Sequence, residues 1–122
     1  MEITLFDTNA VIYLQKGLLA EPLPAGEYAL SVISEMELLS WCGLTPNQYT
    51  WLSKFMNQLQ IYEIDREAKL KAIELRRENQ IKLPDAIIAA TAITKNATLL
   101  TNDADYLKIA GLKCRQLKLL SD

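Results

Sequence analysis

The sequence has no histidine, and it has only two cysteines among its 122 residues. Without histidine there can be no histidine-ligated zinc site, and no serine or cysteine hydrolase that depends on a histidine base. Any catalysis must therefore use carboxylates, hydroxyls, lysines or a bound ion.

The two cysteines, Cys42 and Cys114, are far apart and match no metal-ligand spacing. We therefore predict reduced thiols in the protein core and a reducing, cytoplasmic location. Long apolar runs are also missing, and no basic segment precedes a hydrophobic stretch near the first residue. We expect neither a membrane anchor nor a signal peptide.

An excess of charge of one sign is lacking as well, because 13 lysines and arginines accompany 15 aspartates and glutamates, for a net charge of −2. This balance excludes a general basic field for nonspecific nucleic-acid binding and leaves only a local basic patch. The candidates for such a patch form no clear pattern and are Lys16, Lys54, Arg76, Arg77 and Lys82. Because half of the residues are hydrophobic, we predict one globular domain over residues 1–122.

Short runs of strand-forming residues alternate with longer segments of helical periodicity. The predicted strands are 3–6, 28–32, 61–64, 98–101 and 114–117. The predicted helices begin near capping residues or prolines, at Thr8 or Asn9, Ser34, Pro46, Asp65, Asp85 and Asp103. Alternation of this kind favours an α/β protein with a parallel sheet and right-handed crossovers.

Four acidic residues stand at the ends of these predicted elements. Asp7 follows the first strand and Asp103 follows the fourth, so both should lie at the edge of the sheet where parallel strands end. Asp85 opens an almost wholly apolar helix, and the sequence does not fix it at that edge. Glu37 lies in the first turn of the helix that Ser34 is expected to cap.

Each of these carboxylates, taken singly, also has a purely structural explanation. Asp7 and Asp103 can cap helices, Asp85 can interact with a helix dipole, and Glu37 can complete a capping box. Taken together they indicate a cation site, because clustered carboxylates repel one another unless a cation lies between them. An all-oxygen site suits Mg²⁺ or Mn²⁺, which can polarise a phosphodiester and activate water. The chemistry indicated is metal-assisted phosphodiester hydrolysis.

Four segments of the chain resemble the PIN-domain ribonucleases, particularly the VapC toxins of bacterial toxin–antitoxin pairs. In chain order they are Asp7–Asn9, Ser34–Leu39, Leu83–Ala92 and Leu100–Tyr106, of which the third is the most specific. The resemblance implies a three-layer α/β/α fold with a central parallel sheet of strand order 3-2-1-4-5. It also implies a metal-dependent endoribonuclease that acts as a toxin on RNA and is inhibited by a cognate VapB-like antitoxin.

The same resemblance assigns roles to individual residues. Those implied to hold Mg²⁺ or Mn²⁺ are Asp7, Glu37, Asp85 and Asp103. Thr101 matches a hydroxyl position beside the site, Asp105 matches an additional acidic position, and Asn9 resembles an amide that orients Asp7. Tyr106 stands where phenylalanine is commoner in the family, and we expect it to pack as an aromatic anchor.

Two other functions are alternatives to the toxin. A PIN-like fold without activity could serve as a binding module, but mutually repelling carboxylates would then have no reason to be kept together. A receiver-like phosphoacceptor domain also gathers acids at strand ends, yet it needs an acidic pair after its first strand and an aspartate ending its third. Here one aspartate follows the first strand, and Ile64-Asp65 runs straight into a charged helix.

The sequence also suggests where partners bind. The apolar surplus in residues 46–59 would suit a homodimer face. A pocket of four carboxylates attracts cations, so a protein inhibitor is expected to insert a basic residue into it. The resemblance implies that an antitoxin's C-terminal segment folds across a groove beside the pocket, and the surfaces around residues 8–20 and 36–59 are the predicted groove.

Overall fold

The computed structural model describes residues 2–121 and shows strands and helices alternating along the chain. The strands are β1 (Ile3–Phe6), β2 (Glu27–Ser31), β3 (Gln60–Tyr62), β4 (Thr98–Leu100) and β5 (Cys114–Arg115). The helices are α1 (Thr8–Gln15), α2 (Val32–Leu39), α3 (Pro46–Met56), α4 (Arg66–Glu78), α5 (Leu83–Thr94) and α6 (Ala104–Leu107). The predicted domain of 1–122 includes positions 1 and 122, which lie outside the described residues.

All five strands are parallel and follow the order β3-β2-β1-β4-β5, which confirms the predicted topology. In the central strand, Leu5 stands opposite Ala29 and Leu99, so these three side chains share one face of the sheet. The next residue along, Phe6, stands opposite residues of β2 and β4 on the other face. The sheet is therefore buried on both faces, as parallel sheets usually are.

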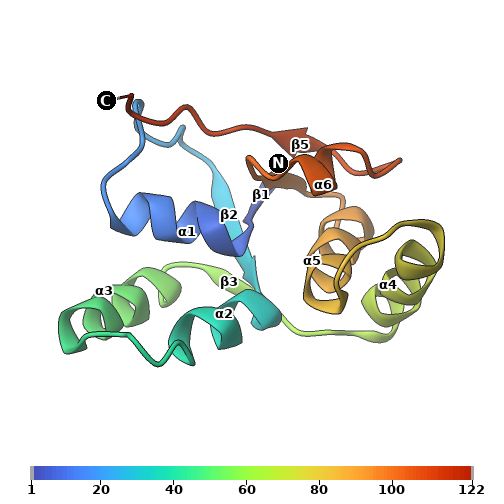
Figure 1. Cartoon of the computed structure of the whole chain (residues 1–122), viewed down its shortest axis with the longest axis horizontal. Coiled ribbons are helices and arrows are strands. Elements are labelled where there is room, and N and C mark those ends of the chain that lie inside the picture. The colour runs from blue at the N-terminus through green and yellow to red at the C-terminus, as the bar shows by residue number, and fades with distance from the viewer. Residues whose placement is uncertain (1, 122) are drawn as a thin grey trace.

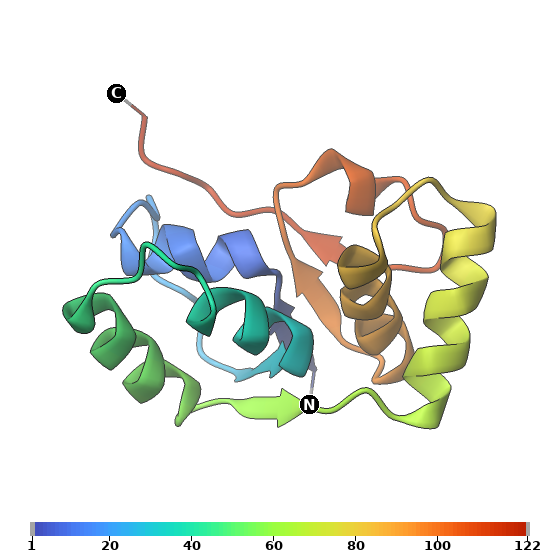
Figure 2. The same ribbon diagram turned by 60° about the horizontal axis from the view of Figure 1, so that its bottom comes forward.

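Helices cover both faces of the sheet and produce the three layers that were predicted. Figures 1 and 2 show α4 and α5 on one side, and α1, α2 and α3 on the other. The face that carries Leu5 packs against α4, α5 and α6 in one core cluster, while the face that carries Phe6 packs against α1, α2 and α3 in a second. Helix α5 is apolar on almost every side, and its buried residues run from Ala86 to Ala92. Its expected deep burial is confirmed.

Helix α2 begins three residues earlier than predicted. Its N-cap is Ser31, whose side chain accepts a hydrogen bond from the Ile33 N–H at 3.2 Å. Ser34 is fully buried inside the helix, so the prediction that it caps α2 is wrong. Val32 and Ile33 are β-branched and resembled the end of a strand, but their position after a serine cap places them in the first helical turn. Glu37 therefore lies beyond the first turn, and the capping-box explanation for it fails.

Other boundaries differ by a few residues. Helix α5 begins at Leu83 and holds Pro84 in its first turn, where proline is tolerated, so Asp85 is its third residue. Asp65 caps α4 as predicted and accepts a hydrogen bond from the Ala68 N–H at 2.9 Å.

Cys42 is exposed, so its predicted burial in the core is wrong. Among residues 2–121, no helix is both long enough and apolar enough to cross a membrane.

The apolar residues of segment 46–59 are mostly used inside the domain. Leu52 and Met56 are buried, and Phe55 packs edge-on against Phe6 with ring centroids 5.4 Å apart. Tyr49 is exposed over half of its surface. Much of the apolar surplus that suggested a homodimer face therefore belongs to the core, and the homodimer stays a prediction.

Candidate metal centre

The four predicted carboxylates line one pocket of about 160 Å³ together with Thr8, Asn9 and Tyr106. Asp7 and Asp103 reach it from the ends of β1 and β4, which are neighbours at the point where the strand order reverses. Asp85 arrives from α5, which leads directly into β4. The beginning of α5 therefore lies at the edge where β4 ends, which places Asp85 with the others.

Asp7 is the most deeply buried carboxylate of the pocket, with 3% of its surface exposed. It caps α1 by accepting a hydrogen bond from the Ala10 N–H at 2.6 Å, and its other oxygen accepts one from the Thr101 hydroxyl. Burial raises the pKa of Asp7, these two hydrogen bonds act in the opposite direction, and the charges of Asp103 and Asp85 raise it further. Asp7 is thus both a helix cap and a member of the acidic pocket.

Thr101 links the Asp7 carboxylate to the backbone of Asp103 through one hydroxyl. Fully buried, it donates to Asp7 and accepts a hydrogen bond from the Asp103 N–H at 3.0 Å. Asp103 in turn caps α6, because its carboxylate accepts from the Asp105 N–H at 2.9 Å. The hydroxyl predicted beside the site therefore fixes the turn after β4 relative to the end of β1.

Asp85 is held by an aromatic side chain. The Tyr106 hydroxyl donates to the Asp85 carboxylate at 3.2 Å, and the ring is almost completely buried. Burial raises the pKa of Asp85, the Tyr106 hydrogen bond lowers it, and the charge of Asp103 raises it. Burial and the Asp85 charge strongly raise the pKa of Tyr106, so its hydroxyl stays protonated and able to donate. The predicted aromatic anchor is confirmed, and its hydroxyl adds a contact that the packing prediction did not include.

Glu37 is the exposed member of the set and comes from the middle of α2. Its Oε1 lies 2.7 Å from the Thr8 hydroxyl oxygen, which belongs to the first residue of α1. Sequence reasoning missed Thr8. The signal available was a hydroxyl residue directly after Asp7, which points to the same edge of the sheet.

Asn9 lines the pocket and is exposed. It was predicted to orient Asp7, but the hydrogen bonds that orient Asp7 come from Ala10 and Thr101. Those two donors come from the first turn of α1 and from the residue after β4, and a role of Asn9 in the site stays a prediction.

Asp105 contributes its backbone to the site. Its N–H donates to Asp103, while its own carboxylate lies 3.4 Å from the Lys108 Nζ on the exposed side of α6. Asp105 does not line the acidic pocket. Its predicted role as an additional acid is therefore limited to a longer-range effect, a small upward contribution to the pKa of Asp85.

The four carboxylates have the donor chemistry of a site for Mg²⁺ or Mn²⁺. Burial and mutual repulsion raise the pKa of Asp7 and Asp85, and a bound cation would offset both effects. Among residues 2–121, no three acidic or cysteine side chains already lie close enough together to hold an ion. The four carboxylates suit a divalent cation because they are oxygen donors and line one pocket. Their oxygens are not arranged in a complete coordination shell.

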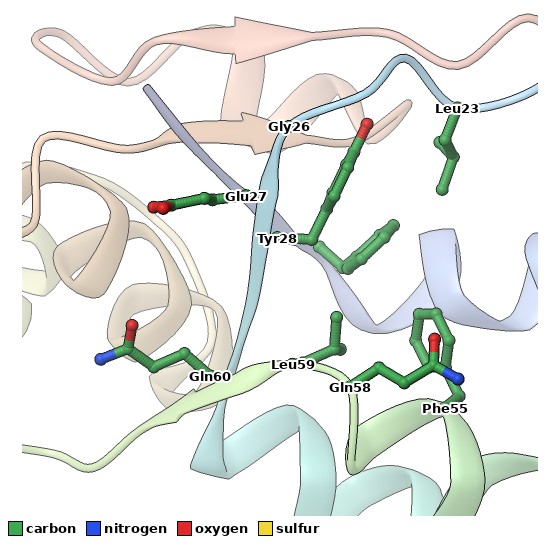
Figure 3. Close-up of a pocket in the computed structure, with 9 residues that line it drawn as sticks. Leu23, Gly26, Glu27, Tyr28, Phe55, Gln58, Leu59 and Gln60 are labelled. Carbon is green, nitrogen blue, oxygen red and sulfur yellow. The ribbon is translucent and has the colours of Figure 1, made fainter. Parts of the chain in front are cut away.

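A larger hollow than the acidic pocket lies between α3 and the beginning of β2 and has a volume of about 570 Å³. Figure 3 shows its aromatic rings, with Glu27 directed away from Tyr28 and Phe55. Phe6 stacks on Tyr28 with ring centroids 5.2 Å apart. With one carboxylate in its lining, this hollow lacks the donors of a cation site, so volume does not identify the chemical centre here.

An apolar groove adjoins the acidic pocket and has a volume of about 270 Å³. Its lining residues come from α1, α2, α3 and the loop before α3, and are Thr8, Ile12, Gln15, Lys16, Glu37, Leu38, Trp41, Leu44, Gln48 and Leu52. Thr8 and Glu37 line both the groove and the pocket. All ten residues fall within the segments 8–20 and 36–59, where a groove was predicted.

Replacing Tyr106 by Phe should lower the free energy of unfolding of the metal-free protein at neutral pH by about 1 kcal/mol, because a hydrogen bond to a half-exposed carboxylate is lost while the ring is kept. The loss should shrink near pH 4, since the bond favours the ionised form of Asp85. Urea unfolding in EDTA at both pH values measures it. Tyr28→Phe, which loses a hydroxyl bonded to the Pro24 carbonyl, is the control. An equal loss at both pH values would contradict the assigned bond.

Comparison with known proteins gives a family and several similar folds. The sequence model of the PIN domain family matches residues 4–112. A chain of VapBC2 from Rickettsia felis, bound to a promoter DNA fragment, is 25% identical with a TM-score of 0.79, and the match covers 93% of this chain and 98% of that chain. A toxin–antitoxin complex from Klebsiella pneumoniae gives 31% identity, a TM-score of 0.72, and coverage of 89% and 94%.

DNA-bound VapBC from Salmonella typhimurium is 20% identical with a TM-score of 0.81, covers 95% of this chain and 98% of that chain, and shows similarity of fold. No match was found among curated proteins. These solved chains are covered over more than nine-tenths of their length, so the similarity extends over the whole domain.

Proposed function

The chain belongs to the PIN domain family, and from this premise we propose that it is a metal-dependent endoribonuclease and the toxin of a toxin–antitoxin pair. The observation that carries the proposal is the acidic pocket. Four carboxylates from the end of β1, α2, α5 and the residues after β4 meet at the switch point of the sheet. A fold that only needed helix caps would have no reason to bring Asp85 and Glu37 to the same place.

Asp7, Glu37, Asp85 and Asp103 would hold Mg²⁺ or Mn²⁺ in this pocket. A bound ion of this kind supplies polarisation of a phosphodiester and a lowered pKa for a water molecule. The residues of the chain keep the carboxylates in place: Thr101 joins the ends of β1 and β4, and Tyr106 holds Asp85. Because these donors are hydroxyls and backbone amides, the carboxylates remain available as oxygen ligands.

RNA is the proposed substrate, and two of the five candidate basic residues lie beside the pocket or in the adjoining groove. The charge of Lys82 lowers the pKa of Asp85, and Lys16 lines the apolar groove next to Glu37. Arg77 instead lines a separate hollow on α4 with Leu70 and Ile73. Lys16 and Lys82 are therefore the preferred contacts for backbone phosphates.

The proposed partner is a VapB-like antitoxin. Similar folds occur in VapBC complexes and in a toxin–antitoxin complex, and in this chain an apolar groove runs into an acidic pocket. A partner segment with apolar residues in the groove and an arginine or lysine at the pocket would match both surfaces. A cytoplasmic location and a homodimer stay predictions from the sequence.

Cleavage of RNA should require Mg²⁺ or Mn²⁺ and should stop in excess EDTA, because no side chain of this histidine-free chain can activate water alone at neutral pH. The test is digestion of total bacterial RNA by the purified protein with and without the chelator, followed by addition of excess Mn²⁺. Equal cleavage in EDTA would reject the metal mechanism. If the protein neither cuts RNA with either metal nor arrests growth, the inactive binding module replaces this proposal.

A further inference from the structure

We propose that Thr8 is a positioning residue, supported by the buried Ser34, that holds the carboxylate of Glu37 in the acidic pocket. The inference rests on the proposed function, in which Glu37 is a metal ligand, and it assigns roles to two residues outside the carboxylate set. The structural basis is a chain of three side chains that connects α1 with α2.

The geometry of this chain is short and continuous. The Thr8 Oγ1 lies 2.9 Å from the Ser34 Oγ and 2.7 Å from the Glu37 Oε1. Ser34 is fully buried in α2, while Thr8 is half-buried at the start of α1, directly after the Asp7 cap. Each distance is that of an ordinary hydrogen bond between oxygens.

The direction of the two hydrogen bonds follows from counting protons. The Thr8 hydroxyl carries one proton, and an ionised Glu37 can only accept. The Thr8 proton therefore points to Glu37, where the bond is charge-assisted, and the Ser34 hydroxyl donates to the Thr8 oxygen. Ser34 is buried and satisfied by this arrangement, and a donor behind Thr8 strengthens its own donation.

Glu37 needs such a support more than the other three carboxylates. Asp7 and Asp103 cap helices through backbone N–H groups, and Asp85 is short and bonded to Tyr106. Glu37 has a longer side chain, is exposed, and stands at the border between the pocket and the apolar groove. Without Thr8 it would be free to rotate out of the pocket, and binding a cation would then cost the entropy of ordering it.

The test measures Mn²⁺ affinity by calorimetry for the wild type, Thr8→Val, Thr8→Ser and Ser34→Ala. Valine keeps the branched shape and removes the hydroxyl, so affinity should fall by roughly 10-fold, the low end of the effect of removing a group that orients a metal ligand. Serine keeps the hydroxyl and should restore most of the affinity. Ser34→Ala leaves the bond from Thr8 to Glu37 in place and should weaken binding less than Thr8→Val.

A double-mutant cycle separates positioning from a general structural effect. In a Glu37→Ala background, Thr8→Val should cause no further loss of Mn²⁺ affinity, because its effect passes through Glu37. A further loss of the same size there, or equal weakening by Thr8→Ser and Thr8→Val, would overturn the positioning role. So would unchanged Mn²⁺ affinity in Thr8→Val.

The two proposals can fail separately. If the wild-type protein binds Mn²⁺ and cuts RNA while Thr8→Val behaves like it, the positioning role is rejected and the proposed function stands. If the wild type binds no Mn²⁺ and cuts no RNA, the proposed function is rejected, and the assignment of Glu37 as a supported ligand is rejected with it.

Discussion

Asp7→Asn should reduce the rate of RNA cleavage about 10²-fold to 10³-fold. This is the range typical for removing one preorganised charged or polar group from a reaction centre. Asparagine can still accept the Ala10 N–H and caps helices about as well as aspartate, so α1 should remain intact. Because asparagine carries no charge, one of the four carboxylates that line the pocket is lost without loss of the fold. An RNase assay at saturating Mg²⁺, with circular dichroism as the control for folding, measures the effect.

The same variant should melt at a higher temperature than the wild type in EDTA at neutral pH. Burial and the neighbouring acids raise the pKa of Asp7 in the folded protein, so its ionised form destabilises the folded state. This destabilisation is complete when the pH lies above the pKa of Asp7 in the folded protein. It disappears as the pH falls through that pKa toward the value of about 3.9 for the unfolded chain. The advantage of Asp7→Asn should therefore shrink between neutral pH and about pH 4.

Asp7→Ala separates the cap from the charge. It removes the same repulsion but also the hydrogen bond at the start of α1, which typically costs about 1 kcal/mol. It should therefore melt below Asp7→Asn at every pH. A melting temperature for Asp7→Asn clearly below that of the wild type at neutral pH would show that Asp7 serves the fold more than the site.

The strands explain why part of the site could be predicted. Asp7 and Asp103 each follow a short apolar strand, and parallel strands end at one edge, so their proximity followed from the sequence. Asp85 could not be placed in this way because it lies on a helix. Its position depends on how α5 packs against the sheet, and that packing is decided by buried residues along its whole length.

The contacts that orient the carboxylates were the least predictable part. Thr8 and Glu37 are 29 residues apart and meet only because α1 and α2 pack side by side. The start of α2 was predicted three residues too late, because Val32 and Ile33 have strand propensity and Ser31 and Ser34 are both good caps. Local sequence patterns cannot decide whether Ser31 or Ser34 is the cap. The pairing of β2 with β1 decides it, because Leu30 pairs with Phe6 at the end of β1 and β2 ends one residue later, at Ser31.

The second large effect concerns the partner, and it should appear as a change in growth. Expression of the chain alone in a bacterium should arrest growth, and co-expression of a small protein encoded next to it should relieve the arrest. The groove and pocket explain why: one partner segment can fill the apolar surface and place a cationic group among the carboxylates at the same time. Because such a segment is ordered only on binding, apolar anchoring must supply much of the affinity.

Trp41 is the residue of this chain that is expected to anchor the partner. It lines the groove, and 59% of its surface is exposed. Tryptophan is enriched among the few interface residues that contribute most of the binding energy. Gly43 allows its ring to lie close to the backbone, because a Cβ at position 43 would be 2.8 Å from the Trp41 ring.

Trp41→Ala should therefore still arrest growth, because Trp41 does not line the acidic pocket, but co-expression of the partner should no longer relieve the arrest. Loss of an anchor of this kind costs about 2 kcal/mol or more, which corresponds to a Kd raised roughly 30-fold. Tyr49→Ala is the matched control, since Tyr49 is an exposed aromatic residue on α3 that does not line the groove. Titration of the purified partner measures both affinities. If Trp41→Ala is relieved as completely as Tyr49→Ala and binds the partner as tightly, the antitoxin does not use this groove, and the acidic pocket alone must account for inhibition.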